Sequence, residues 1–293
     1  MTVGLRHAIA RTLAYADIFD HPLRLDEIHR YLIGHRASPA EVESALSRDE
    51  SLRAVVERSD EWYHLRGRSR IVDVRRRRKE ASARLWPAAR RYARVIAGLP
   101  LVRFVAVTGA LSMDSAEEGG DVDLFVLTRP GRLWTARLLI LAVVRFAALR
   151  GVTLCPNFLL STDHALLTER NVFTAHELTQ MVPIAPTLDG DRLRAANAWT
   201  GEFLPNAGGV AQGAGPVSLV SRTLSAILAW RIFDAFERWE MRRKVRRLEA
   251  RARREGGSVA FSAGECRGHF AAHDVRVRAA YAARCAELDE VLR

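Results

Sequence analysis

The segment that most constrains the fold is residues 101–161, in which strand-like and helix-like patterns alternate. Three short apolar runs, "LVRFVAVTG", "DVDLFVLT" and "GVTLCPNFLLS", have the length and composition of buried strands. A turn rich in glycine and acidic residues separates the first two, and "GRLWTARLLILAVVRFAALR" separates the last two as a helix. The order β–turn–β–α–β predicts an α/β (α+β) protein built around a mixed β-sheet.

Two aspartates stand at the start of the second predicted strand. Because side chains alternate along a strand, Asp121 and Asp123 share one face and Val122 points to the other. Two carboxylates this close disfavour ionisation of both unless a cation lies between them. Mg²⁺ is such a cation, since it prefers one or two carboxylates together with substrate phosphates. Upstream, Gly109 ends the first strand, where the missing side chain lets a phosphate approach the backbone.

The segment "TGALSMDSAEEGGDVDLFVLT", residues 108–128, resembles the signature of the DNA polymerase β-like nucleotidyltransferase superfamily. In that family a strand ends in Gly-Ser, a short helix follows, and Asp-x-Asp begins the next strand. The resemblance implies that Asp121 and Asp123 hold two Mg²⁺ ions, and that Gly109 and its neighbours bind the triphosphate of ATP or another NTP. It implies transfer of an NMP from the NTP to an acceptor hydroxyl or phosphate, on a small molecule, protein or RNA that the sequence does not identify.

Two positions depart from the family pattern. Ala110 stands where the family usually has serine, and Ser112 is the nearby hydroxyl that could replace it. The family's third carboxylate has no counterpart on the third strand, where Asn157 could offer a metal only its carbonyl oxygen. Asp163 and Glu177 could supply the missing charge, but their local patterns favour a helix N-cap and a helix surface residue. Two hypotheses stay open: an active nucleotidyltransferase, or a degraded fold acting as a nucleotide- or nucleic-acid-binding regulatory module.

Arginines after the second predicted strand complete the expected nucleotide site. Arg129 and Arg132 could reach a triphosphate, because guanidinium groups bind phosphate through paired hydrogen bonds, or they could lie in solvent. The predicted site then consists of metal-binding Asp121, Asp123 and Asn157, of which the two aspartates are catalytic, and nucleotide-binding Gly109, Ala110, Ser112 and Arg129.

The rest of the chain divides into modules around this core. Residues 1–68 show three helical patterns followed by a hairpin, which predicts a winged-helix-like domain. Its third helix, "PAEVESALSRDE", is acidic, so DNA binding is possible but not favoured. A linker helix is expected over 69–100, with the basic run at 75–79 on its solvated side. The nucleotidyltransferase domain then spans 101–200, a flexible loop 201–216, and a helical region 217–293 that would supply the acceptor pocket.

The charge and cysteine content restrict the partners and the compartment. The chain of 293 residues carries a net charge of +11, mostly from arginine, which favours nucleotide phosphates, nucleic acid or an anionic lipid surface. Its three cysteines are far apart, which argues against a disulfide framework and favours a reducing cytoplasm. The apolar stretches at 138–144 and 224–230 are shorter than the ~20 residues that span a bilayer, so we expect a cytoplasmic protein with no transmembrane segment.

Overall fold

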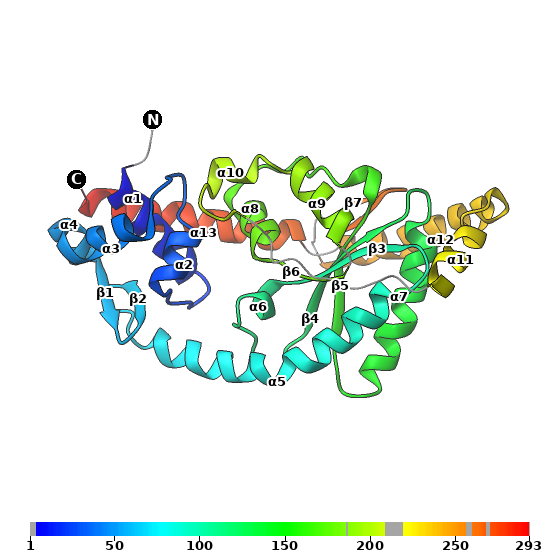
Figure 1. Ribbon diagram of the computed structural model, residues 1–293, viewed down its shortest axis with the longest axis horizontal. Coiled ribbons are helices and arrows are strands. Elements are labelled where there is room, and N and C mark those ends of the chain that lie inside the picture. The colour runs from blue at the N-terminus through cyan, green and yellow to red at the C-terminus, as the bar shows by residue number, and fades with distance from the viewer. Residues whose placement is uncertain (1–3, 186, 209–218, 256–259, 268–269, 293) are drawn as a thin grey trace.

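A computed structural model describes residues 4–185, 187–208, 219–255, 260–267 and 270–292 (Figure 1). Its centre is a six-stranded mixed sheet, whose strand order is β6-β3-β4-β5-β8-β7. The strands are β3 (Val102–Thr108), β4 (Val122–Thr128), β5 (Leu154–Ser161), β6 (Val182–Ala185), β7 (Ala260–Phe261) and β8 (Glu265–Arg267). The predicted α/β class with a mixed sheet is therefore confirmed.

One parallel pair lies at the middle of the sheet. Strands β4 and β5 are parallel and are joined by α7 (Leu133–Ala148), whereas β3 pairs antiparallel with both β4 and β6. A parallel connection needs a crossover of about a dozen residues or more, and the apolar helix supplies it. Strands β7 and β8 form a hairpin that adds to the outer edge of β5 in antiparallel orientation. The three strands and the helix expected over 101–161 are all present.

Helices cover both faces of this sheet. One face packs against α5 (Ile71–Ala97), α7 and α12 (Asp234–Glu255). The other packs against α8 (Val172–Gln180), α9 (Thr187–Ala196), α10 (Thr200–Phe203) and α13 (Phe270–Val291). Alternation along β4 explains the division, because Val122, Leu124 and Val126 enter the first core while Phe125 and Leu127 enter the second. Asp123 therefore points toward the α8 side.

The N-terminal module forms the end of the molecule at which both termini lie (Figure 1). It contains α1 (Leu5–Asp17), α2 (Leu25–Arg30), α3 (Pro39–Arg48), α4 (Glu50–Val55), β1 (Val56–Ser59) and β2 (Trp62–Leu65). The end of α13 packs into its core through Leu288 and Leu292. Buried Asp17 ties the parts together, because it accepts hydrogen bonds from Arg68 at 2.7 Å and from Arg284 at 2.8 Å. The first and last helices of the described chain thus form one unit.

Several boundaries differ from the sequence expectation. Helix α8 ends at Gln180, and β6, which lies outside the three strands expected from the sequence, follows on the edge of the sheet. The hairpin pattern beginning at residue 52 starts instead with α4, because the Asp49 side chain accepts the Leu52 N–H at 3.0 Å and caps a helix. Strands β7 and β8 lie in a region expected to be only helical. Most of the loop expected at 201–216 lies outside the described residues.

The linker helix expected over 69–100 is present as α5, but its basic run is not simply a solvated face. Arg75 is buried, and it donates hydrogen bonds to Glu27 Oε1 and to the Met113 carbonyl, each at 2.8 Å. The side chain of Arg78 is only 20% exposed. That interpretation of residues 75–79 is therefore wrong for these two arginines, because the N-terminal module and the β3–β4 connection cover one side of the helix. Within the described residues, every helix is too short or too polar to cross a bilayer.

Candidate functional site

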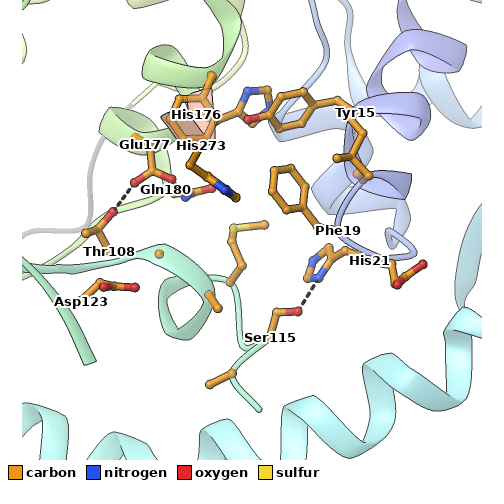
Figure 2. Close-up of a pocket in the computed structure, with 18 of the residues that line it drawn as sticks. Tyr15, Phe19, His21, Thr108, Ser115, Asp123, His176, Glu177, Gln180 and His273 are labelled. Atoms are coloured by element: carbon orange, nitrogen blue, oxygen red, sulfur yellow. Dashed lines mark hydrogen bonds between the residues drawn. The ribbon is translucent and has the colours of Figure 1, made fainter. Parts of the chain in front are cut away.

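A cavity of about 1350 Å³ lies between the N-terminal module, the ends of β3 and β4, and helices α8 and α13 (Figure 2). Side chains from each of these elements line it. From the sequence-predicted set, the cavity contains Gly109, Ala110, Asp121, Asp123 and Asn157. Residues separated by most of the chain are thus gathered around one space that is large for a ligand site, since single-ligand pockets commonly measure about 300–1,000 Å³.

The Asp-x-Asp pair enters this cavity from the start of β4. Asp123 lies opposite Thr108 in the β3–β4 ladder, which places its carboxylate directly beside Gly109. Gly109 has a backbone φ of +65°, and a Cβ at this position would collide with Asp123 Oδ2. Only glycine satisfies both conditions without strain. The glycine that the sequence assigned to phosphate approach is therefore also required for the packing of the carboxylate.

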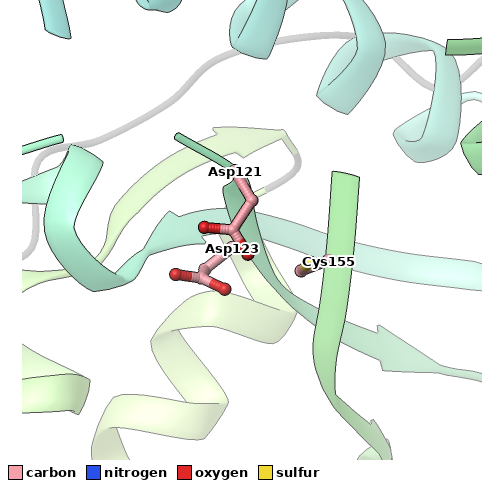
Figure 3. Close-up of side chains that lie close together, drawn as sticks. All are labelled: Asp121, Asp123 and Cys155. Atoms are coloured by element: carbon pink, nitrogen blue, oxygen red, sulfur yellow. The ribbon is translucent and has the colours of Figure 1, made fainter. Parts of the chain in front are cut away.

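Asp121 and Cys155 complete a cluster around Asp123 (Figure 3). One carboxylate oxygen from each aspartate and the Cys155 Sγ lie within 4.8 Å of one another. Asp121 is exposed, whereas Asp123 and Cys155 are half-buried. Burial, followed by a hydrogen bond and charge repulsion from Asp121, raises the pKa of Cys155 to about 12. The thiol is therefore neutral near pH 7.

Glu177 on α8 brings a third carboxylate to the cavity (Figure 2). Thr108 Oγ1 donates to Glu177 Oε2 at 2.9 Å, and Gln180 Nε2 donates to Glu177 Oε1 at 2.9 Å. Thr108 is also the ladder partner of Asp123, so its hydroxyl holds Glu177 close to the Asp-x-Asp pair. The interpretation of Glu177 as an ordinary surface residue is wrong, because α8 packs its inner face on the sheet side that carries Asp123.

Burial and neighbouring acidic groups shift the protonation of Asp123, and burial shifts that of Glu177. Burial, together with the charges of Asp121 and Glu177, raises the pKa of Asp123 to about 7. Burial also raises the pKa of Glu177 to about 7, although the hydrogen bonds from Thr108 and Gln180 oppose that shift. Both carboxyls therefore titrate near neutral pH, where a group can accept and release protons. A cation would favour the ionised forms of the pair.

Asn157 and Asp163 are the other two residues considered for the position of the missing third carboxylate, and only Asn157 lies in the cavity. Asn157 faces the cavity from β5, and its side-chain amide donates a hydrogen bond to Asp123 Oδ1. In this arrangement the amide orients Asp123. Asp163 lies beyond the far end of β5, where its carboxylate accepts a hydrogen bond from Ser161 Oγ at 2.5 Å. It does not cap a helix as the sequence suggested, and it is not among the described residues that line the cavity.

Three predicted phosphate-binding groups do not reach the cavity. Ser112 Oγ donates to the Gly109 carbonyl at 2.8 Å, so its hydroxyl closes the short helix α6 (Gly109–Ser112) rather than replacing the missing serine. Arg129 is exposed and lies at the opposite end of β4 from Asp123. At about 3.3 Å per strand residue, the two residues are roughly 20 Å apart along the strand. Arg132 is buried and donates to three carbonyls just after α11 (Leu219–Leu228) or at its end, and to Asp234.

Other cations face the cavity instead. Arg78 reaches it from α5 and donates to the Phe19 carbonyl at 2.8 Å and to Glu117 Oε1 at 2.9 Å. Arg276 reaches it from α13 and is exposed. Sequence spacing could not identify these two arginines, because each enters the cavity from a helix whose position depends on the N-terminal module.

The N-terminal module, α8 and α13 together form an aromatic wall of the cavity (Figure 2). Tyr15 of α1 stacks on His176 of α8, with ring centroids 4.0 Å apart and an interplanar angle of 16°. Phe19 and His273 lie along the same wall, with ring centroids 6.4 Å apart. Burial lowers the pKa of His176 to about 4, and its Nδ1 donates to the Val172 carbonyl at 2.8 Å. The ring is therefore neutral at physiological pH and serves as a flat, apolar surface.

The donor set at this site fits Mg²⁺. Asp121 and Asp123 offer hard oxygen ligands from one strand, and the exposed side of Asp121 leaves room for water and for substrate phosphates. The neutral thiol of Cys155 is a poor partner for such an ion.

No protein-family model, curated protein or solved structure gives a significant match to the chain.

Proposed function

We propose that this protein is an Mg²⁺-dependent nucleotidyltransferase that moves an NMP from an NTP to an acceptor hydroxyl or phosphate. The observation that carries the proposal is the position of Glu177, which adds a third carboxylate to Asp121 and Asp123 inside one cavity. The sequence motif alone lacked this group. With it, the site holds two metal-binding carboxylates and a separate carboxyl whose pKa lies near 7.

Each acidic side chain has a distinct role in this proposal. Asp121 and Asp123 hold the metal, and the amide of Asn157 fixes the orientation of Asp123. Bound Mg²⁺ supplies positive charge for the triphosphate and for the oxygen that attacks the α-phosphorus. Glu177 accepts the proton of the acceptor hydroxyl, because a base whose pKa is near the working pH is well matched to that task.

The nucleotide and the acceptor occupy different parts of the cavity. Gly109 and Ala110 present backbone to the triphosphate beside Asp123, and Arg78 and Arg276 add positive charge from two helices. The remaining space extends toward the aromatic wall. A volume of about 1350 Å³ is enough for an NTP together with a second small molecule or a flexible end of a larger one.

The contact of Asn157 with Asp123 favours a second candidate function. In the nucleotidyltransferase superfamily that the motif resembles, the strand corresponding to β5 supplies a carboxylate that acts as a base or metal ligand. Here β5 carries Asn157, whose amide cannot accept a proton. In this second candidate function, the protein binds an Mg²⁺-nucleotide complex and acts as a sensor of the nucleotide, without transferring an NMP. The two functions differ in whether Glu177 matters for turnover or only for binding.

The test measures binding and transfer separately. Calorimetry with α,β-methylene-ATP, which cannot release pyrophosphate, measures nucleotide binding with and without Mg²⁺. Incubation with each α-³²P-labelled NTP and a mixture of RNA, protein and small-molecule extracts measures transfer. We expect Asp121→Asn with Asp123→Asn to lower Mg²⁺-dependent binding about 100-fold and to reduce transfer by at least about 10³-fold.

Glu177→Gln separates the two candidates. For an enzyme, this variant binds the analogue within about 3-fold of wild type but loses transfer by roughly 10²- to 10⁴-fold. Asp163→Asn, an acidic residue outside the cavity, is the matched control and leaves both measurements unchanged. Wild-type binding without any transfer supports the sensor function, and Mg²⁺-independent binding contradicts both.

A further inference from the structure

An apolar surface is exposed at the end of the molecule opposite the termini, where α11, η2 (Arg231–Phe233) and α12 protrude (Figure 1). Ile232 is 73% exposed, Trp230 64% and Trp239 56%. Two exposed tryptophans beside an exposed isoleucine are unusual on a surface in contact only with water. We call this the α11–α12 surface, consisting of Leu224, Ile227, Trp230, Ile232, Phe236 and Trp239.

The acidic residues of this segment are each held by hydrogen bonds. Asp234 accepts from Arg132 at 2.6 Å, and buried Glu237 accepts from the Trp134 and Thr135 backbone N–H groups at 2.7 and 2.8 Å. Glu240 is 1% exposed and pairs with Arg243. Residues 231–248 hold three acidic and seven basic side chains, and because Glu237 and Glu240 are buried and Asp234 is paired with Arg132, the outer face is mainly cationic.

Arginines border the apolar side chains on this outer face. Arg238 and Arg242 of α12 are exposed, and the Arg243 guanidinium lies 5.2 Å from the centre of the Trp239 ring. Phe236 packs beside Trp239 with ring centroids 5.8 Å apart. Aromatic rings flanked by arginine suit the boundary between acyl chains and headgroups, because the ring enters the apolar layer while the guanidinium meets phosphate.

The core fixes the orientation of the α11–α12 surface. Arg132 donates to the carbonyls of Leu228, Ala229 and Trp230, at 2.8, 3.0 and 2.9 Å, and so ties the junction of the two helices to the start of α7. Met241, Val245 and Leu248 on the opposite side of α12 pack into the core beneath. The exposed side chains therefore belong to a preformed surface that needs little reorganisation to bind.

We infer that the α11–α12 surface binds an anionic lipid membrane. Charge complementarity favours this partner: arginines supply attraction to acidic headgroups, and the three acidic side chains of residues 231–248 are each held by hydrogen bonds to α7 or to neighbouring arginines. Nucleic acid would also attract the arginines, but exposed isoleucine, leucine and tryptophan side chains together match acyl chains better than a phosphate backbone. The inference does not depend on the proposed catalytic activity.

The experiment measures binding of the full chain to vesicles of phosphatidylcholine with and without 30% phosphatidylglycerol, a composition chosen for the test. Co-sedimentation in about 0.1 M salt, with brominated lipids as quenchers of tryptophan fluorescence, reports both affinity and depth. We expect binding to the anionic vesicles only, quenching by the bromines, and weaker binding as salt is raised. No binding to anionic vesicles, or equal binding to neutral ones, would overturn the inference.

Two double variants locate the contact. We expect Trp230→Gln with Trp239→Gln to lower the vesicle partition coefficient by at least about 10-fold and to remove the quenching. Arg238→Ala with Arg242→Ala should lower it roughly 20-fold on anionic vesicles. Matched controls remove exposed apolar or cationic side chains elsewhere: Phe146→Gln on α7 with Leu149→Gln just after it, and Arg77→Ala with Lys79→Ala on α5.

The controls decide whether this surface is responsible. Each pair should leave partition within about 2-fold of wild type, apart from the general effect of charge that the α5 pair measures. Equal losses in controls and surface variants overturn the inference. So does a surface variant that weakens binding to a 20-mer RNA but not to vesicles, or one that converts a dimer into a monomer by light scattering. Circular dichroism checks that each variant is folded.

Discussion

The cavity and the α11–α12 surface handle charge in opposite ways. In the cavity, acidic groups are gathered and buried, and burial raises the pKa of both Asp123 and Glu177 to about 7. At the α11–α12 surface, Glu237 and Glu240 are buried, Asp234 is paired with Arg132, and Arg238 and Arg242 are left in solvent. A chain with one overall basic composition thus builds an acidic interior site and a cationic exterior face.

Charge contributes to folding at some positions of the molecule and is available for ligands at others. Buried groups with many partners, such as Arg75, hold elements together, and their removal destabilises the protein. Buried groups of like sign, such as Asp123 and Glu177, oppose folding and are candidates for function. Exposed arginines do neither, so replacing them changes binding and leaves stability nearly unchanged. Four measurements of unfolding test this division.

The largest effect is expected at Arg75. Arg75→Met removes hydrogen bonds to Glu27 and to the Met113 carbonyl and leaves a carboxylate only partly exposed, so the free energy of unfolding should fall by about 3–5 kcal/mol. Arg77→Met, two residues along the same helix and exposed, is the matched control and should change it by less than about 0.5 kcal/mol. Urea unfolding measures both. If both variants change the free energy of unfolding by the same small amount, the contacts of Arg75 do not stabilise the fold.

Gly109→Ala tests the close approach of backbone and carboxylate. The added Cβ meets both a positive φ and Asp123 Oδ2, so we expect a loss of about 2–3 kcal/mol of stability and weaker Mg²⁺ binding. Gly119→Ala is the control, because Gly119 has a φ of +70° but no heavy atom lies within 4 Å of the point that an added Cβ would occupy. It should lose only about 1 kcal/mol. If the two variants behave alike, Asp123 does not press on residue 109.

Glu177→Gln should stabilise the metal-free protein in a pH-dependent way. The folded-state pKa of Glu177 is about 7, above its ordinary value of 4.5, so the folded protein keeps a proton that the unfolded chain has lost between these pH values. Stability from Glu177 is therefore present below pH 4.5 and is lost as the pH rises through 7. The variant should gain on the order of 2 kcal/mol at pH 8 and almost nothing at pH 4. A gain that is the same at both pH values contradicts the assignment.

The smallest effect is expected at the α11–α12 surface. Arg238→Ala with Arg242→Ala removes two exposed charges that make no buried contact in the described structure, so the free energy of unfolding should stay within about 0.5 kcal/mol of wild type. Thermal unfolding in low and high salt measures the change. A loss comparable to that of Arg75→Met would mean that these arginines support the fold, and the contrast between the two regions would fail.

The core of the fold was predictable because its signals are local. The strands β3, β4 and β5 are continuous apolar runs, and α7 between them is an apolar helix of full length, so pattern and structure agree. Strands β6, β7 and β8 were missed because they are two to four residues long and lie toward the edges of the sheet. Strands this short form only when the backbone N–H and C=O groups of a neighbouring strand are available to pair with them, and a local sequence pattern does not show this.

The candidate site was predictable only in part, for a related reason. Asp121, Asp123 and Gly109 share one β-turn-β unit, so local spacing places them together. Glu177 reaches them because α8 packs across the sheet, and Arg276 because α13 returns to the N-terminal module. Arg129 failed for the opposite reason: it is close in sequence to Asp123 but stands at the other end of the same strand.

The return of α13 to α1 also sets the order of events during synthesis. Tyr15 from the first helix and Arg276 from the last line the same cavity, and Leu288 fills the core of the N-terminal module. At usual elongation rates roughly 10 to 50 s separate the emergence of these two helices from the ribosome. A nascent chain that already carries Asp121, Asp123 and Glu177 therefore has an unfinished cavity. The cavity is therefore complete only after α13 has been synthesised.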